Sequence, residues 1–535
     1  MPGRTPARLR DGVAEDVIIG IDLGTTNSCV SGVVDGQIRV FADENGDRIQ
    51  ASMVSFLEDG SVLVGNEARK EQVKDPRNTV YSAKRLIGRH FDSRVVQAAR
   101  QQVPFEVVRG RNDVPLIEAR GEQYGLPEIS GMVLRRMRDI AEYNLGRPVS
   151  RAVVTVPANF NDTQRQMTKL AGGLAGLDVV RVVNEPTAAA LAYGYGRHLS
   201  ARVAVYDFGG GTFDITLLEV QRNVFEVLST AGDSYLGGDD FDNRLAKYML
   251  LGFQQQHGFP IEHDTVAVSR LKQVAERLKC ELSERDRSAV SIRELARDAH
   301  GRPCDLTFQV DREAFNLRCK DIVQRTFSIC DEALRDAGLK AADLDAVVLV
   351  GGSTRIPLVR DMVSGYFGRP AMSDINPVEV VAIGAAIQGA ALNQEVFSEV
   401  TQTPLLIDVT PMSLGVRTVQ GYFEKLIERN TSIPCEETRT FTTAQDAQTA
   451  VRLQIYQGES NVVDENVKLG ELELYDLRPA GRGEVEIEVT FEVDTNGIIV
   501  VTARDRETGM EQGTRIKVSA GYSEEEVAEM MRRSQ

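Results

Sequence analysis

The chain has 535 residues, of which 42% are hydrophobic and 26% charged, a composition typical of a packed globular protein with room for about three domains. Its formal net charge of −16 argues against nucleic-acid binding, which normally requires a basic surface. No run of about 18 apolar residues occurs, so no membrane span is predicted.

The first segment, residues 1–15, is basic and then polar and lacks the apolar core of a signal peptide. It is therefore expected to be a disordered tail. Six cysteines are scattered without the spacing of a metal site: Cys29, Cys280, Cys304, Cys319, Cys330 and Cys435. In a chain of this size they predict reduced thiols and a cytoplasmic location.

Strand-like and helical patterns alternate along the first three quarters of the chain. Strands are predicted at 17–23, 151–157, 202–208 and 346–352. Asn161 is a good N-cap for a helix that should break at Gly172 and Gly173. Apolar residues at helical spacing predict a second helix over 269–286. This alternation indicates an α/β architecture.

Two strand-and-turn segments resemble each other. "IGIDLGTTNS" (19–28) and "VYDFGGGTFD" (205–214) share the order strand, Asp, apolar residue, Gly, then a small hydroxylated residue. The repetition suggests two related lobes that face a shared cleft.

The pattern changes near residue 398. Two prolines flank a short apolar run within 401–411, which is typical of a linker. Short alternating strands follow, with an Asn496-Gly497 hairpin turn, and predict an all-β domain up to residue 522. Ser523 and Glu526 form a capping box that begins a helix over 523–535.

The glycine-rich turns indicate a nucleotide site. Turns without side chains let backbone N–H groups point at phosphate oxygens, and Thr25, Thr26 and Thr212 add hydroxyl donors. Asp22 and Asp207 would repel phosphate unless Mg²⁺ and its waters lay between them. No GxxxxGK[ST] motif is present. The alternative is a pair of tight turns with incidental glycines, which a third such turn at 348–357 disfavours.

Longer segments carry a family resemblance. They are "IGIDLGTTNSCV", "VTVPANFNDTQRQ", "VNEPTAAALAYG", "VYDFGGGTFD", "LGGDDFD", "VGGSTRIP" and "DVTPMSLG". Together, over residues 17–530, the chain resembles the seventy-kilodalton heat-shock chaperones, the DnaK family. The resemblance implies a two-lobed, actin-like ATPase domain (a duplicated ribonuclease-H-like fold) over 16–398, a linker over 399–408, and a β-sandwich peptide-binding domain over 409–522. The start of a helical lid would follow at 523–535.

The resemblance also implies a Mg²⁺–ATP site, with K⁺ as a further ion. Lys84 would reach the γ-phosphate and the attacking water, Glu185 would orient a Mg²⁺-bound water, and Asp214 would lie near the hydrolytic water. Catalytic roles extend to Asp207 and Thr212, and Asp22, Asp207 and Glu185 would hold the metal. The implied nucleotide contacts are Gly24, Thr25, Thr26, Asn27, Gly209, Gly210, Gly211, Thr212, Glu276, Lys279, Ser283, Gly351, Gly352, Ser353 and Arg355.

Some of these residues also have a plainer interpretation. Glu185 could be a first-turn acid that complements a helix dipole. Glu276, Lys279 and Ser283 share one helix face and could simply be solvated.

Communication and peptide binding are implied in the same way. Pro157, Arg165 and Asp408 would relay the nucleotide state. A peptide groove would be lined by Val416, Val419, Phe441, Ala444, Val451 and Leu453. Val416, Phe441 and Leu453 could instead fill the sandwich core.

The implied function is that of an ATP-dependent chaperone that binds exposed hydrophobic segments of unfolded proteins. It would be gated by slow ATP hydrolysis and served by a J-domain partner and a GrpE-like exchange factor. The alternative is a nucleotide-dependent regulatory or scaffold protein with one dedicated partner. A sugar kinase of the same superfold is disfavoured, because it would leave the β domain and the linker without a role.

The chain departs from the family pattern in three places. Almost all of the helical lid is missing, which predicts fast peptide exchange in both nucleotide states. Pro404 lies in the linker and has no N–H, so a linker that docks as a strand would lose one donor and couple the domains more weakly. Cys280 and Val378 stand where some members have a basic residue and an acid.

Overall fold

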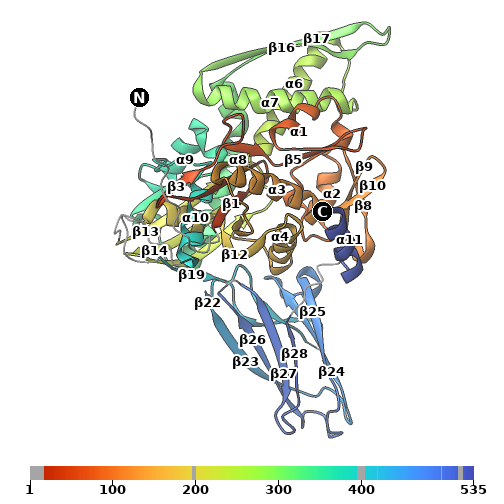
Figure 1. Ribbon diagram of the computed structural model, residues 1–535, viewed down its shortest axis with the longest axis vertical. Helices are drawn as coiled ribbons and strands as arrows, with labels where there is room; N and C mark the ends of the chain where they lie inside the picture. Colours follow the sequence, from red (N-terminus) through yellow and green to blue (C-terminus); the bar gives the residue numbers. More distant parts are fainter. Residues whose placement is uncertain are drawn as a thin grey trace, which may run out of the picture.

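The computed structural model describes residues 17–195, 200–393, 404–418, 420–495, 497–515 and 522–534. The expected tail 1–15, linker residues 399–403, Val419 and Asn496 lie outside these ranges. An α/β body occupies the upper part of Figure 1, and a β domain lies below it.

Two sheets with the same strand arrangement organise the α/β body. The first has the order β12 (Asp178–Asn184), β11 (Arg151–Val156), β1 (Ile18–Leu23), β2 (Asn27–Val34) and β3 (Gln37–Val40), with β4 (Ile49–Ala51) on β2. The second begins β18 (Ala346–Val350), β13 (Ser200–Phe208), β14 (Phe213–Gln221) and β15 (Val224–Asp233). In each, the strand that ends in the glycine turn pairs parallel to one neighbour and antiparallel to the other. We call the two halves lobe I and lobe II.

Smaller elements extend each lobe. Lobe I adds the sheets β6 (Val62–Val64), β5 (Met53–Phe56), β7 (Thr79–Tyr81) and β10 (Glu122–Gly125), β9 (Pro115–Ala119), β8 (Glu106–Arg109), with helices α1 (Asn66–Glu71), α2 (Arg94–Arg100), α3 (Leu126–Leu145) and α4 (Asp162–Leu174). Lobe II adds α6 (Gly238–His257), α7 (Thr265–Glu284), the hairpin β16 (Arg287–Arg297) and β17 (Pro303–Asp311), α8 (Arg312–Asp336) and α9 (Pro357–Phe367). Helix α7 confirms the helix predicted over 269–286, but it begins four residues earlier, at Thr265, and ends two residues earlier, at Glu284.

Helices α5 (Glu185–Gly194) and α10 (Val380–Leu392) pack against each other and against the two main sheets. Glycine makes this close approach possible. A Cβ on Gly384 would lie 1.7 Å from the Ala188 carbonyl oxygen, and one on Gly20 would lie 2.2 Å from the Ala386 nitrogen. The lobes therefore share a tightly packed centre: a side chain at Gly384 would force the two helices apart, and one at Gly20 would force α10 away from β1.

Helix α4 corrects one prediction. Asn161 caps it as expected, accepting from the Gln164 N–H at 2.9 Å. The helix does not break at Gly172 and Gly173 but continues to Leu174. A Cβ on Gly172 would lie 2.2 Å from Val179 Cγ2 on the neighbouring strand. The glycine is therefore needed for helix-to-sheet packing rather than for ending the helix.

The β domain consists of two four-stranded antiparallel sheets around one apolar core. The first has the order β21 (Phe423–Ile427), β20 (Leu414–Arg417), β24 (Val451–Gln457), β25 (Val467–Leu474), and the second β23 (Cys435–Thr442), β26 (Glu486–Val493), β27 (Ile499–Asp505), β28 (Glu511–Arg515). The predicted hairpin joins β26 to β27, where the Gly497 N–H donates to the Asp494 carbonyl oxygen at 2.9 Å. The fold thus has the predicted all-β sandwich.

The end of the expected linker is a strand of the lobe II sheet. β19 (Leu405–Val409) runs parallel to β15 and is followed by the short β22 (Ser432–Ile433). The Leu405 N–H donates to the Asn223 carbonyl oxygen at 2.9 Å. Pro404 precedes this strand, and because strand residues alternate, its nitrogen points away from β15. The expected loss of a linker hydrogen bond to this partner strand is therefore wrong.

The last helix, α11 (Glu524–Ser534), lies against lobe I (Figure 1). Ser523 and Glu526 form the predicted capping box at 2.7 and 3.2 Å. Met530 and Tyr522 join the apolar core of lobe I. All six cysteines are free. Within the described ranges, no helix combines the length and apolar character needed to cross a membrane.

Candidate functional site

The two predicted glycine turns meet at the boundary between the lobes. A Cβ on Gly210 would lie 1.9 Å from Thr26 Oγ1, and one on Gly211 would lie 2.4 Å from Thr25 Cγ2. The glycines therefore leave room for the opposite turn as well as for a ligand. The Ser353 hydroxyl of the third turn donates to the Gly209 carbonyl oxygen at 2.7 Å, so all three turns are linked.

A cleft of about 370 Å³ opens beside these turns. It is lined by most of the predicted nucleotide and metal residues: Asp22, Gly24, Thr25, Thr26, Asn27, Glu185, Asp207, Gly209, Gly210, Thr212, Glu276, Lys279, Gly351, Gly352, Ser353 and Arg355. Gly211 and Ser283 do not line it. Gly211 faces Thr25, and the Ser283 hydroxyl donates to the Lys279 carbonyl oxygen at 3.1 Å.

Other lining residues had no sequence signal of their own. They are Ile49, Val350, Pro377 and Val381, together with Cys280 and Val378, which had been noticed only as departures from the family pattern. These six make part of the wall apolar, which suits a base or sugar face better than a phosphate.

Three buried carboxyl groups, Asp22, Asp207 and Glu185, line the cleft. Asp214 and Lys84 do not line it, but both are buried and interact electrostatically with this group. Burial raises the pKa of Asp22 to about 7, with the Glu185 carboxylate adding to the shift and Lys84 opposing it. Burial also raises the pKa of Asp207 and of Asp214 well above the usual range, again with Glu185 as a neighbour. The Asp214 carboxylate is fully buried, and the Asn159 backbone N–H is the hydrogen-bond donor that lowers its pKa against the effect of burial. This concentration of acid charge is costly unless a cation offsets it.

Lys84 is the cation that the chain itself supplies. Its Nζ lies 2.5 Å from Glu185 Oε1, also donates to the Leu23 carbonyl oxygen, and is 5.6 Å from the Phe160 ring centre. One ammonium group cannot neutralise four carboxylates, so the residues fit a further metal ion. Among the described residues, no three His, Cys, Asp or Glu side chains are arranged to chelate an ion together. Mg²⁺, which retains several waters, suits such a site.

The far side of the cleft is held by ion pairs. Lys279 Nζ lies 2.7 Å from Asp242 Oδ2 on α6, and Glu276 lies 3.4 Å from Arg69 on α1. Arg355 Nη2 donates to Asn376 Oδ1 at 2.6 Å. These residues are therefore not a freely solvated helix face, because each is tied to a neighbouring element.

A line of hydrogen bonds leads from Arg165 in lobe I to the linker strand. Arg165 donates to the Ala158 and Phe160 carbonyl oxygens, just after Pro157, and to Asn184 Oδ1 at 2.6 Å. Asn184 Nδ2 in turn donates to both carboxylate oxygens of Asp408 in β19 at 2.9 Å. Asn184 immediately precedes Glu185, and sequence reasoning had given it no role.

Further contacts fix the β domain against both lobes. The Asp162 N–H donates to Gln457 Oε1 at 3.0 Å, and Arg429 Nη2 lies 2.8 Å from Asp336. Burial raises the pKa of Asp162 to about 7 and also raises that of Asp408. The interface thus contains ionisable groups as well as backbone pairing.

The expected peptide-groove residues differ in exposure. Val416 and Leu453 are buried in the sandwich core, at 1% and 7% exposure. Phe441 and Val451 are half-buried and pack against the core from its edge, and Ala444 is also half-buried. Val419 lies outside the described residues.

The site and the fold define a protein with a nucleotide-type cleft between two lobes and a β sandwich attached through a linker strand. A family model described as "Hsp70 protein" matches residues 18–535. The chain therefore belongs to the Hsp70 family, whose members in general are nucleotide-dependent chaperones and ATPases.

Proposed function

We propose that the chain is an ATP-dependent chaperone that binds exposed hydrophobic segments of unfolded proteins, gated by ATP binding and slow hydrolysis to ADP. The observation that carries this proposal is the hydrogen-bonded line from Arg165 through Asn184 to Asp408. It connects residues beside the cleft to the strand that leads into the β domain. Because Asn184 directly precedes Glu185, we expect a change of state at Glu185 to be passed through Asn184 to Asp408 and from there to the β domain.

The actin-like reading is supported by the matching strand order and directions of the two main sheets. We propose the nucleotide-binding domain at 16–398, the linker at 399–408, the peptide-binding domain at 409–522 and a lid segment at 523–535.

In the proposed site, Asp22, Asp207 and Glu185 would hold Mg²⁺ through its waters, and the metal would neutralise phosphate charge when bound. Lys84 would place its ammonium group beside the γ-phosphate, since phosphoryl transfer depends mainly on positioning and charge. Asp214 would orient the hydrolytic water or hold K⁺, because its buried carboxylate lies beside Glu185 and a bound cation would offset that acid charge. Thr212 lines the cleft at the end of the second turn and would donate its hydroxyl to phosphate.

For peptide binding, we propose that Val451, Ala444, Phe441 and Val419 contact an extended apolar segment, while Val416 and Leu453 support them from the core. Main-chain hydrogen bonds would add to an apolar pocket. A J-domain protein and a GrpE-like exchange factor would serve as partners in the cytoplasm. A dedicated scaffold with weakened coupling is not favoured, because Pro404 leaves the pairing of β19 with β15 intact.

A peptide array tests this function. The full chain should bind many heptamers that are rich in apolar residues. Val451→Asp should abolish that binding, whereas Val462→Asp, at a position that is 50% exposed on another loop, should not. Binding of a single sequence, or equal binding by both variants, would contradict the proposal.

A further inference from the structure

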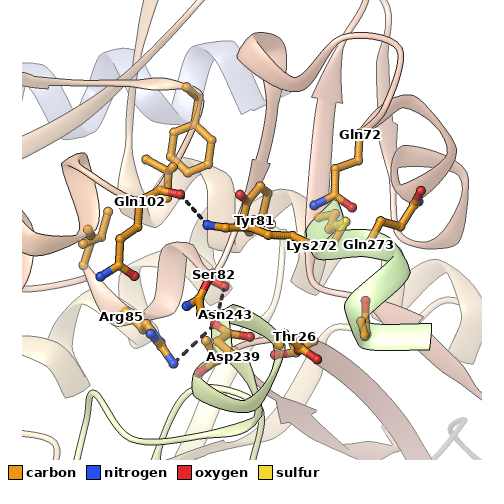
Figure 2. A pocket seen from close by; sticks show the side chains of 18 of the residues that line it. Thr26, Gln72, Tyr81, Ser82, Arg85, Gln102, Asp239, Asn243, Lys272 and Gln273 are labelled. Atoms are coloured by element: carbon orange, nitrogen blue, oxygen red, sulfur yellow. Dashed lines mark hydrogen bonds and ion pairs between the residues drawn. The ribbon is translucent and has the colours of Figure 1, made fainter. Parts of the chain in front are cut away.

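A second pocket lies next to the nucleotide-type cleft. It has a volume of about 100 Å³ and shares Thr25, Thr26 and Glu276 with the cleft. One wall comes from lobe I and is largely apolar, formed by Met53, Tyr81, Leu86, Ala99, Val103 and Phe105. The opposite wall comes from α6 and α7 of lobe II, with Asp239, Asn243 and Lys272 (Figure 2).

Direct bonds between the lobes border this pocket. Lys272 Nζ donates to the Gln102 carbonyl oxygen at 2.7 Å, and Arg85 lies 3.3 Å from Asp239 (Figure 2). Ser82 also donates to Asp239 at 3.3 Å. The pocket is therefore part of the contact surface between the lobes, and an occupant would touch both.

The charges around the pocket already have partners. Arg85 is paired with Asp239, Lys272 with a carbonyl oxygen, and Asp242 with Lys279. Glu276 is paired with Arg69. The hydrogen-bond partner of Lys272 is neutral, but the Asp239 and Asp242 carboxylates lie near enough to offset its charge. A charged ligand would therefore lose its hydration without meeting an uncompensated counter-charge, which is costly. An uncharged ligand avoids this cost.

The lining also favours a ring with one polar end. The apolar wall can bury a ring, although the pocket is smaller than the ~150 Å³ cavity that holds benzene and opens toward solvent. Asp242 Oδ1 has no hydrogen-bond partner, and the Gln72 and Gln273 amides lie at the same pocket. An amide-like end supplies the donor and acceptor that these groups need.

We propose that this pocket binds an uncharged, ring-sized organic molecule with an amide-like end, and that its occupant holds the two lobes closed. The regulatory part rests on the proposed binding of nucleotide in the adjoining cleft. Because coupling between two sites is reciprocal, the ligand tightens nucleotide binding, and bound nucleotide tightens ligand binding by the same factor. Affinity changes of this kind arise mostly in the dissociation rate, so the ligand slows nucleotide release.

The probe for the test is 4-fluorobenzamide. Its binding to the full chain without nucleotide is measured as broadening of its ¹⁹F resonance. We expect broadening with the wild type and with Ala98→Phe, which lies on α2 outside the lining. We expect none with Ala99→Phe, which fills the pocket. If circular dichroism shows that Ala99→Phe is unfolded, Val103→Phe, at a half-buried lining position, replaces it as the occluding variant and should likewise show no broadening. No broadening in the wild type, or equal broadening in the occluding variant, would overturn the proposed site.

Release of a fluorescent ADP then tests the coupling. Saturating 4-fluorobenzamide should slow release by about fivefold or more, the lower end of ordinary coupling, in the wild type but not in Val103→Phe. An unchanged release rate with the probe bound would overturn the regulatory role. Failure to bind fluorescent ADP at all would instead contradict the proposed nucleotide function, so the two failures are distinguishable.

Discussion

Asn184→Ala should weaken the docking of the linker strand, because Asn184 at the end of β12 ties Asp408 of β19 to lobe I. The change removes the amide that donates to both oxygens of the Asp408 carboxylate at 2.9 Å and accepts from Arg165 at 2.6 Å. Hydrogen bonds to charged groups are worth about 1.5–3 kcal/mol, and Asp408 is buried. Docking should therefore weaken by about 10- to 150-fold.

Amide hydrogen exchange of Leu405–Val409, read by mass spectrometry, measures this directly, because the amides of β19 that face β15, such as that of Leu405, lose their partners when the strand undocks. Asn144→Ala is the matched control, since its amide donates to the Ala42 and Ile140 carbonyl oxygens in lobe I, far from the linker. Exchange of β19 that stays within about twofold of the wild type, or that rises equally in the control, would refute the reasoning.

Three further predictions concern the same framework. Gly211→Ala would place a Cβ 2.4 Å from Thr25 Cγ2, and such overpacking costs about 1–3 kcal/mol. Calorimetry should therefore show that the variant binds ATP about 5- to 150-fold more weakly. An unchanged affinity would count against the interlocking of the two turns. Burial in the docked state raises the pKa of Asp162 to about 7 and also raises that of Asp408, so docking takes up protons. Exchange of β19 should accelerate as pH rises from 5.5 to 7.5 by more than the intrinsic exchange rate, and Asp162→Asn should reduce that excess. Pro404→Val should leave exchange of β19 within about twofold, because residue 404 points away from β15; a large gain in protection would contradict this register.

Local patterns predicted the strands and turns of the site well. "IGIDL" and "VAVYDF" are strands β1 and β13, and each ends at the expected acid and glycine turn. The predictions worked because period, capping and glycine preference act over a few residues. Gly172 shows the limit of such local predictions. A glycine is required there because Val179 on a neighbouring strand packs against it, and the residues around Gly172 in the sequence do not reveal that contact.

Long-range contacts account for the other differences. Asn184, Asp242 and Ile49 acquire their places only when distant elements meet, and none belongs to a pattern with a local meaning. The second pocket likewise exists only because α2 and α7 face each other across the two lobes. The prediction for Pro404 was wrong because a missing N–H matters only on the edge of β19 that pairs with β15. Which edge pairs is set by the sheet and cannot be seen in the linker sequence.

Single-turnover hydrolysis of ATP by the full chain, with and without an apolar heptapeptide, tests the central claim most directly. If the cleft is a catalytic nucleotide site that communicates with the β domain, ATP is converted to ADP slowly, the peptide accelerates the step several-fold, and Lys84→Ala abolishes both rates. A rate that the peptide does not change, or that survives in Lys84→Ala, would contradict the account.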